Sequence, residues 1–317
     1  MVAQYSMDKN KIGAAIQYFR ESYNISQAKL CKGLCSIATL SRIESGDRDV
    51  DSLLLETLLE RLGKTPNMFE LILTDLDYEL YLKREEIMIQ IQERNCMNLS
   101  ELINQYEKIT ETKGSIHRQF VTYCKALQND LNNGPIKLTI ELLLESITCT
   151  VPDFQTSTIK EYYLSLSELN VIVNIIQHMI EAGMINSAKE ILKQVVEYFE
   201  NHFPEEENYR LYIKVAIIAS RFHLEEGEYI QALNMCNKGL ERNKGSRKLE
   251  RLESLTYLKA QIMEALLNSK ANIGISREDC INQYLQSYYL FSFLDDFLTA
   301  NQIKKHLREE YQWEDID

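Results

Sequence analysis

Two twelve-residue segments of the chain repeat each other in register, and this repeat constrains the fold more than any other feature. They are EAGMINSAKEIL, residues 181–192, and EEGEYIQALNMC, residues 225–236. Each has a glycine at its third position, Gly183 and Gly227, and an alanine at its eighth. A glycine permits the sharp turn that ends a helix, and a small residue permits two helices to cross closely. The repeat therefore predicts pairs of helices stacked as a solenoid.

A weaker third copy, NNGPIKLTIELL, lies at residues 132–143 and has Gly134 and Thr139 at the glycine and alanine positions. The three glycines are separated by 49 and 44 residues. These offsets exceed the ~34 residues of a regular tetratricopeptide unit, so some helices must be longer or the connections inserted. Segments 93–106 and 252–289 are candidates for degenerate first and last units. The aromatic-rich YLQSYYLFSFLDDFL would then cap the stack or form a partner surface.

The scarcity of helix-breaking residues extends the helical prediction to the whole chain. Only 4 Pro and 11 Gly occur in 317 residues, and Leu, Ile, Glu, Lys and Gln recur at three- and four-residue spacing. This composition predicts an all-α protein without strands. A chain of this length divides into two or more folding units or forms a repeat array. We expect a first domain at 1–66, a linker helix region at 67–95 and a solenoid domain at 96–317.

Neither membrane insertion nor secretion is indicated by the sequence. The longest apolar run, around 171–176, is far shorter than the ~20 residues that cross a bilayer. The first residues, MVAQYSMDKNK, lack the apolar region of a signal peptide. The seven cysteines are scattered and odd in number, a pattern typical of buried free thiols in a reducing compartment. We therefore expect a cytoplasmic protein.

Charge is distributed unevenly along the chain. Residues 1–66 contain nine Lys and Arg and eight acidic residues, a balance of +1. Because the whole chain carries −12, the remaining residues carry −13. An acidic body repels nucleic acid, so any contact with DNA phosphates must be made by the near-neutral N-terminal segment.

The N-terminal segment has the sequence signals of five short helices. Three short polar side chains, Ser26, Ser36 and Asp51, are suited to N-capping because their oxygens accept hydrogen bonds from free amides of a first turn. Gly63 is suited to end the fourth helix. The apolar positions would form one small core, and about 66 residues suffice for an independent module. The predicted helices span 11–23, 26–32, 36–45 and 51–62, and a fifth starts after GKTPN.

Cys31 and Cys35 lie one helical turn apart and raise the question of a metal or redox site. No second ligand pair or nearby histidine completes four zinc ligands. Buried cysteines are common in small cores. We therefore interpret both as core residues and expect no metal site.

The same segment offers a different chemistry if the helix from Ser36 enters a DNA major groove. Gln27, at the start of the preceding helix, could help to hold a phosphate. Arg42 could bind guanine O6 and N7 with two hydrogen bonds, and Ile37 or Ala38 could contact a thymine methyl. An isolated surface arginine is often only solvated, but the whole arrangement favours DNA binding. The candidate DNA-binding residues are Gln27, Ser36, Ile37, Ala38, Thr39 and Arg42.

The segment ISQAKLCKGLCSIATLSRIESG resembles the helix-turn-helix of the phage-repressor and Xre group. The SQ at the start of the second helix and the LSRIESG at the end of the third carry this resemblance. Together with the linker LYLKREEIMIQIQERN and the helix-pair solenoid, the chain resembles the Gram-positive peptide-pheromone receptors of the Rgg, PlcR and PrgX type. That resemblance implies a homodimer on a two-fold DNA site. It also implies DNA contacts from Gln27 and the third helix, although Ile37 and Ala38 replace polar residues of many relatives.

A stripe of amides marks a candidate ligand face in the solenoid. The helix LNVIVNIIQHMIEAG is apolar almost all round, except that Asn170, Asn174, Gln177 and Glu181 fall on one face at spacings of 4, 3 and 4. Amides supply donors and acceptors together, which suits an extended peptide backbone. The alternative is a merely hydrated concave surface.

The repeat register extends this candidate face into the neighbouring units. One unit later, the equivalent positions would add two cations and an apolar contact suited to a peptide carboxylate or acidic side chain. One unit earlier, Lys125 and Gln128 would be equivalent to Asn174 and Gln177. The candidate peptide-binding residues are Lys125, Gln128, Asn170, Asn174, Gln177, Lys214, Ile218 and Arg221.

These features together predict a cytoplasmic, homodimeric transcription regulator that binds promoter DNA and a short signalling peptide. No catalytic constellation, cofactor motif or phosphate-binding loop occurs, so we expect neither an enzyme nor a cofactor. The alternative is a solenoid protein–protein adaptor whose helix-turn-helix does not bind DNA specifically.

Overall fold

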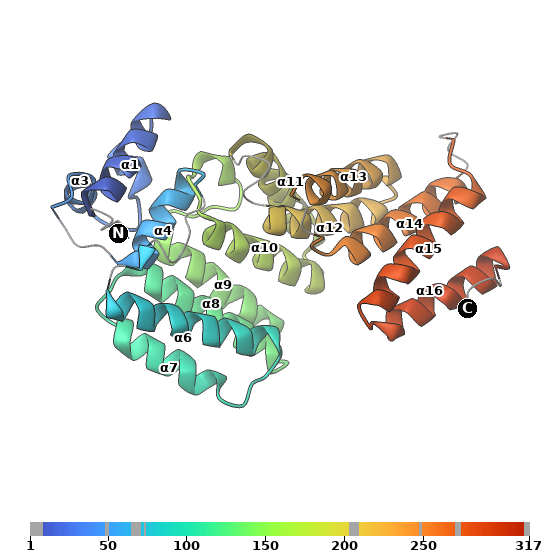
Figure 1. The fold of residues 1–317 in the computed structure, drawn as a ribbon, viewed down its shortest axis with the longest axis horizontal. Coiled ribbons are helices and arrows are strands. Elements are labelled where there is room, and N and C mark those ends of the chain that lie inside the picture. Colours follow the sequence, from blue (N-terminus) through green and yellow to red (C-terminus); the bar gives the residue numbers. More distant parts are fainter. Residues whose placement is uncertain are drawn as a thin grey trace, which may run out of the picture. The chain divides into compact units, whose positions relative to one another are not determined.

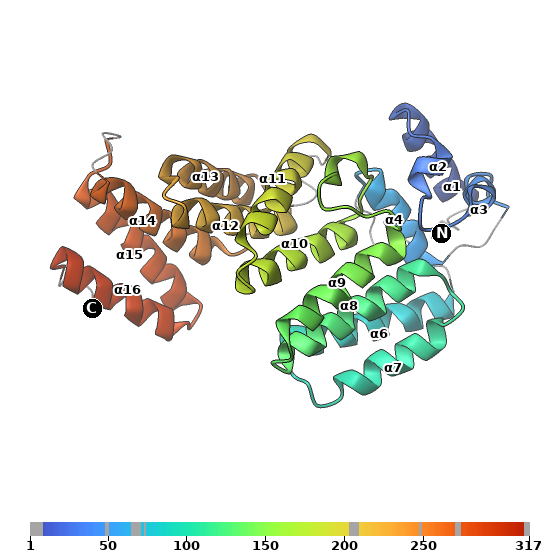
Figure 2. The ribbon, with the colours of Figure 1, turned by 180° about the vertical axis from the view of Figure 1, so that it is seen from behind.

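The structure is a computed structural model that describes residues 9–47, 51–64, 71–72, 74–202, 209–246, 249–269 and 274–313. These residues are helical with connecting turns and contain no strand, which confirms the all-α prediction. The chain divides into two compact units, Met1–Phe203 and Pro204–Asp317. Each unit is described by itself. Figures 1 and 2 show the helices from opposite sides.

Unit 1 begins with four short helices: α1 (Lys9–Ser22), α2 (Gln27–Leu30), α3 (Ile37–Glu44) and α4 (Ser52–Arg61). The three predicted N-caps are confirmed. The Ser26 and Ser36 hydroxyls accept from the backbone amides of Lys29 and Thr39, and the Asp51 carboxylate accepts from those of Leu53 and Leu54. The predicted helix after GKTPN falls mostly on residues 65–70, outside the described residues.

One small core holds these helices together. Ile16, Leu30, Leu40 and Leu58 are fully buried in it. Cys31 is also buried there, and burial raises the pKa of its thiol, which disfavours the thiolate that a metal ion requires. The interpretation of this cysteine as a core residue is therefore confirmed.

The predicted linker helix is α6 (Asp75–Gln92). It starts at a capping box in which Thr74 and Asp77 satisfy each other's backbone amides. Leu80 and Ile87 are buried against α7 (Leu99–Thr110) and the following helix. The helix is therefore packed along its length rather than a free connection (Figure 1). The domain limits at 66 and 95 stay predictions.

Helix pairs follow, as the repeat predicted. Within unit 1, α8 (Ser115–Leu131) pairs with α9 (Ile136–Thr150), and α10 (Leu166–Glu181) pairs with α11 (Ile185–His202). A single 3₁₀ turn, η1 (Ile159–Glu161), lies in the connection between the two pairs. The pairs of unit 2 are α12 (Tyr209–Glu225) with α13 (Tyr229–Ser246) and α14 (Leu252–Asn268) with α15 (Arg277–Phe293), followed by α16 (Phe297–Tyr311).

The two strong copies of the repeat have the predicted geometry. Gly183 and Gly227 adopt φ of +74° and +76° after the first helix of each pair. Ala188 and Ala232 are fully buried. Glycine stands at these turns because other residues strain in the left-handed region, and alanine stands at the crossings because the helices approach closely there.

The weaker copy departs from its prediction by one residue. Thr139 is fully buried, as expected, but the left-handed position belongs to Asn133 (φ +53°) and not to Gly134. Gly134 serves a close approach instead, because a Cβ there would lie 2.1 Å from Oδ1 of Asn129. The Asn129 amide donates to the Pro135 carbonyl and the Thr139 hydroxyl across this turn.

The aromatic-rich segment of unit 2 lies in α15, α16 and the turn between them. Tyr284 and Phe291 are buried in the core of these helices. Others of the same segment, Tyr289, Phe293, Phe297 and Leu298, are exposed. In the part of the chain that the structure describes, no helix is both long enough and apolar enough to cross a bilayer.

Candidate functional site

The outer face of α3 carries the candidate DNA-binding residues. Ile37, Ala38 and Arg42 are exposed on it, whereas Leu40 and Ile43 on the opposite face are buried. Among the described residues, none forms a hydrogen bond or ion pair with the Arg42 guanidinium. This face therefore leaves a cation and two apolar side chains available to a partner.

Ser36 and Thr39 have structural roles on the same turn. Ser36 caps the helix, and its hydroxyl lies 2.9 Å from that of Thr39. Their hydroxyls therefore hold the first turn of α3 in shape at the surface where a DNA groove would meet it.

A buried ion pair that the sequence analysis missed fixes α3 against α1 and α2. Arg20 donates from Nε to Oε1 of Glu44 at 2.7 Å and from a terminal nitrogen to Oε2 at 2.9 Å. Gln27 donates to the same Oε2 at 2.7 Å. One amide hydrogen of Gln27 is thus committed to Glu44, which orients its side chain at the start of α2.

A second buried arginine joins the helix-turn-helix to the helix pairs of unit 1. Arg61, the last residue of α4, pairs with Glu168 at the start of α10, with Nε 3.1 Å from Oε2. The same guanidinium donates to the carbonyls of Leu30, Lys32 and Thr150. One side chain therefore ties the end of α2 and its turn to the end of α9 and the beginning of α10.

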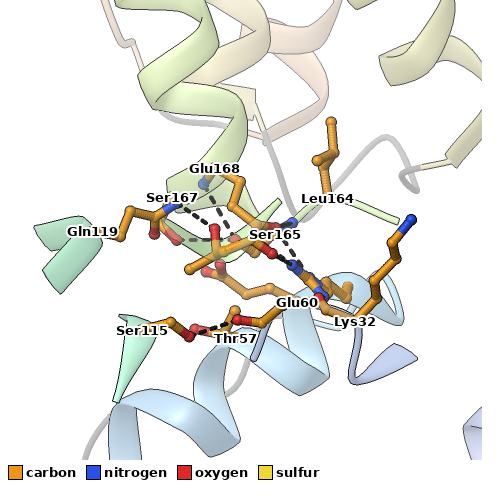
Figure 3. A network of polar contacts seen from close by, with 12 residues as sticks. Lys32, Thr57, Glu60, Ser115, Gln119, Leu164, Ser165, Ser167 and Glu168 are labelled. Carbon is orange, nitrogen blue, oxygen red and sulfur yellow. Dashed lines mark hydrogen bonds and ion pairs between the residues drawn. The ribbon is translucent and has the colours of Figure 1, made fainter. Parts of the chain in front are cut away.

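A capping box at the start of α10 orients the Glu168 side chain for its contact with Arg61. Glu168 forms this box with Ser165, whose backbone amide donates to Oε2 of Glu168 at 2.7 Å. Figure 3 shows this network. The S-x-x-E spacing of a capping box is visible in the sequence, but its ion pair with a residue 107 positions away is not.

We call the contact of Arg61 with Glu168 and its surroundings the joint. Glu60, the neighbour of Arg61 in the sequence, adds a buried carboxyl to this joint. Its Oε2 accepts from the backbone amide of Leu166 at 2.9 Å. Burial, and then the charge of Glu56, raise the pKa of Glu60 to about 8. Burial also raises the pKa of Glu56 to about 6. Near neutral pH, Glu60 therefore favours the protonated state, whereas Glu56 is mostly ionised.

The tight turn between α2 and α3 packs directly against this joint. Gly33 adopts φ +76°, and a Cβ on it would lie 2.0 Å from the carbonyl oxygen of Thr150. Its own carbonyl accepts from the Ser115 hydroxyl at 2.6 Å. The turn of the helix-turn-helix is therefore in contact with both α8 and α9.

Two amides of the α10 stripe already form hydrogen bonds within unit 1. Asn170 and Asn174 both donate to the hydroxyl of Tyr123 on α8, at 2.9 and 3.1 Å. Asn174 is buried and also donates to the carbonyl of Asn170. Gln177 is half-buried, and among the described residues it has no hydrogen-bond partner.

Lys125 and Gln128 of α8 contact α7. Lys125 contacts both carboxylate oxygens of Glu107 on α7, and Gln128 donates to the Ser100 hydroxyl of α7. The register that grouped them with Asn174 and Gln177 was taken from Gly134. Since the left-handed residue is Asn133, the register of α8 shifts by one position, and Cys124 and Leu127 become the equivalents of Asn174 and Gln177. The α8 residue that contacts Asn170 and Asn174 is Tyr123.

The three candidates of unit 2 lie on α12. Ile218 is buried, Lys214 is half-buried and Arg221 is exposed. Burial, and then the charge of Arg251, lower the pKa of Lys214 to about 8. Lys214 therefore loses its positive charge as the pH rises through about 8, and Arg221 is a second cationic side chain on this helix.

Comparisons with known proteins found matches to the helix-turn-helix segment and to the fold of the whole chain. Residues 16–69 match the helix-turn-helix family. PlcR of Bacillus thuringiensis, in a crystal structure with the peptide PapR7 and DNA, has a TM-score of 0.54 and 16% identity over 93% of this chain and 99% of PlcR. Its apo form has a TM-score of 0.56 and 14% identity over 93% and 98% of the two chains.

The apo form of the competence regulator ComR from Streptococcus vestibularis has a TM-score of 0.49 and 19% identity, over 94% of this chain and 97% of ComR. A comparison of the sequence with curated proteins gave no match. The likeness to PlcR concerns the fold. It confirms the predicted resemblance and the order of a helix-turn-helix followed by a solenoid of helix pairs.

Proposed function

From a chain that carries a helix-turn-helix at residues 16–69 and shares its fold with PlcR, we propose a transcription regulator that binds promoter DNA through α3. The observation that carries the proposal is the sidedness of α3. Its inner face is buried and fixed by the Arg20–Glu44 pair, while Arg42 is exposed without a partner among the described residues.

In this function each exposed residue of α3 has a chemical role. Arg42 binds guanine O6 and N7, and Ile37 and Ala38 contact a thymine methyl in the major groove. Ser36 and Thr39 hold the first turn of the helix. Gln27, oriented by Glu44, contacts a phosphate beside it.

Binding of the full-length chain to the DNA upstream of its own gene tests this role. We expect affinity that falls steeply with salt, because cations that bind phosphates displace condensed counterions. Arg42→Ala should reduce the preference for the selected sequence by about 1–3 kcal/mol. Arg118→Ala, an exposed arginine of α8, is the control and should retain the preference. Equal sequence preference in both variants would reject the assignment of α3, and no DNA binding by the wild type would favour the adaptor.

The second half of the proposal is that the solenoid binds a short signalling peptide. PlcR was crystallised with the peptide PapR7, and α10 and α12 of this chain carry amides and cations suited to a peptide backbone and carboxylate. Asn170, Gln177 and Ile218 would contact the peptide, and Lys214 and Arg221 would bind its acidic groups. Asn174 would act by holding Asn170 and Tyr123 in place. Lys125 and Gln128 contact Glu107 and Ser100 of α7, so a peptide that binds them would have to displace these contacts.

A pool of short synthetic peptides, screened against the full-length chain, tests the ligand role. For a peptide selected by the wild type, Gln177→Ala and Arg221→Ala should each weaken binding by about tenfold, the loss expected for one hydrogen bond to a charged or amide group. Gln231→Ala, at an exposed position of α13, should bind as the wild type does. Unchanged affinity in Gln177→Ala would reject α10 as a peptide contact, and unchanged affinity in Arg221→Ala would reject α12.

The proposed regulator acts as a homodimer in the cytoplasm. A two-fold operator requires two helix-turn-helix domains, and the exposed aromatic residues of α15 and α16 provide an apolar surface for self-association. Peptide binding would favour one arrangement of the two DNA-binding domains over another, through its different affinity for the two arrangements.

A further inference from the structure

The C-terminal ends of α8 and α10 bring together three side chains that the proposed function does not use. Asp130 lies in the last turn of α8, and His178 and Glu181 lie in the last turn of α10. One ligand atom from each of the three lies within 4.8 Å of the others. In the described part of the chain, this is the only group of three such side chains with this geometry.

The imidazole of His178 is already oriented as a metal ligand. Its Nδ1 lies 2.8 Å from the carbonyl oxygen of Asn174, so this nitrogen carries the proton and donates it. In the neutral imidazole, the lone pair is then on the other nitrogen, Nε2, which lies on the side of the Asp130 carboxylate. Nε2 lies 3.4 Å from Oδ1 of Asp130, and no hydrogen bond to any described residue accompanies that contact. The side chain is more than nine-tenths buried.

The electrostatics of the cluster favour a cation. Two carboxylates approach each other at the ends of two helices whose terminal carbonyls add partial negative charge. In the described residues, no lysine or arginine forms an ion pair with Asp130 or Glu181. Without a cation the two carboxylates repel each other and face further negative dipoles.

From this geometry we propose that Asp130, His178 and Glu181 form a binding site for a divalent transition-metal ion, with zinc as the ion that fits best. One imidazole nitrogen and two carboxylate oxygens are ordinary zinc ligands, and three protein ligands leave a coordination position for water. The ion would link α8 to α10, the first helices of two successive pairs. The site is independent of the proposed function, because it requires neither DNA nor peptide.

Other histidine–carboxylate contacts of the chain serve as internal comparisons. His306 lies 2.9 Å from Oε1 of Glu264, and His223 lies 2.6 Å from Oε2 of Glu228. Neither pair gathers a third ligand among the described residues. Within the described ranges, only the cluster of Asp130, His178 and Glu181 has the three protein ligands of an open zinc site.

Calorimetric titration of the metal-free, full-length chain with Zn²⁺ tests the site, and Co²⁺ absorption identifies the ligand type. The chain also contains free cysteines, so the comparison is between variants that all retain them. We expect one Zn²⁺ equivalent that is lost or weakened at least about tenfold in His178→Gln, Asp130→Asn and Glu181→Gln. His306→Gln should bind as the wild type does. The Co²⁺ form should lack the thiolate charge-transfer band at this site.

Thermal unfolding gives a second readout, which remains informative if the buried His178→Gln variant does not fold. Zn²⁺ should raise the Tm of the wild type and of His306→Gln, because a ligand that binds only the folded state stabilises it. The shift should be absent in Asp130→Asn and Glu181→Gln, whose substituted side chains are exposed. Zn²⁺ binding and Tm shifts equal to those of the wild type in these two variants would overturn the proposal, as would a wild type that binds no Zn²⁺.

Discussion

Two arginines of the helix-turn-helix, Arg61 and Arg42, differ in burial and in the number of their partners. Arg61 is buried on the face toward the helix pairs, and its donors go to Glu168 and to three backbone carbonyls. Arg42 is exposed on the outer face of α3, and no described residue binds its guanidinium. The same side chain is a structural tie in one place and an available recognition group in the other.

The difference lies in the partners and not in the arginines. The joint around Arg61 is dense in polar groups that must be satisfied, since each buried donor without a partner costs free energy. The face of α3 has no such requirement, because water satisfies Arg42 until a ligand replaces it. In this helix-turn-helix, the buried arginine therefore attaches the domain to the helix pairs, and the exposed arginine is available to bind a partner.

The largest expected effect is that of breaking the buried tie. Arg61→Ala leaves the carboxylate of Glu168 buried without its cation and should cost about 3–5 kcal/mol of unfolding free energy. Urea unfolding of the variant and of Arg118→Ala, exposed on α8, measures the difference. The control should lie within about 0.5 kcal/mol of the wild type. Equal stability of the two variants would contradict the structural role of Arg61.

The next effect tests the turn that contacts this joint. Gly33→Ala places a Cβ 2.0 Å from the Thr150 carbonyl oxygen in a left-handed conformation, so it should cost about 2–4 kcal/mol from backbone strain and overpacking together. Gly183→Ala has a similar φ, with nothing within 4 Å of the added Cβ. It should cost only the strain, about 1 kcal/mol. Equal costs in chemical denaturation would show that the turn does not pack against α9.

A smaller effect concerns the buried carboxyl of the joint, and it depends on pH. The pKa of Glu60 in the folded chain, about 8, lies above its ordinary value. The folded state therefore retains a proton that the unfolded state loses, and stability falls as pH rises from about 4.5 to 8. Glu60→Gln removes this loss, so it should stabilise the protein by about 1 kcal/mol or more at pH 8 and by little at pH 5.

Unfolding curves at both pH values check this prediction. Glu86→Gln, at an exposed position of α6, serves as the control and should have the same small effect at both. A gain for Glu60→Gln that did not grow with pH would mean that the carboxyl is ionised in the folded protein at neutral pH.

The smallest expected effect completes the comparison of the two arginines. Arg42→Ala should change the unfolding free energy by less than about 0.5 kcal/mol, because its exposed guanidinium has no partner among the described residues. The same variant should lose DNA sequence preference. A large loss of stability here would mean that α3 uses Arg42 for folding, and any loss of DNA binding would then have a structural cause.

The parts of the fold that depend on neighbours in sequence were predictable. The N-caps Ser26, Ser36 and Asp51 act on amides two or three residues later, and Gly183 and Gly227 shape turns of a few residues. The exposed face of α3 followed from the 3.6-residue period. In the weaker repeat, Thr139 has the predicted position, but the turn before it was predicted one residue too late, because Asn133 adopts the left-handed conformation that was assigned to Gly134.

The sequence by itself determined that the chain is helical, where its helices begin and which α3 residues face outward, because these depend on interactions within a few turns of one helix. Only the tertiary structure decided that Arg61 meets Glu168, that Gly33 lies against Thr150, and that Asp130 joins His178 and Glu181. These contacts link residues far apart in the chain, and no local pattern records such a pairing.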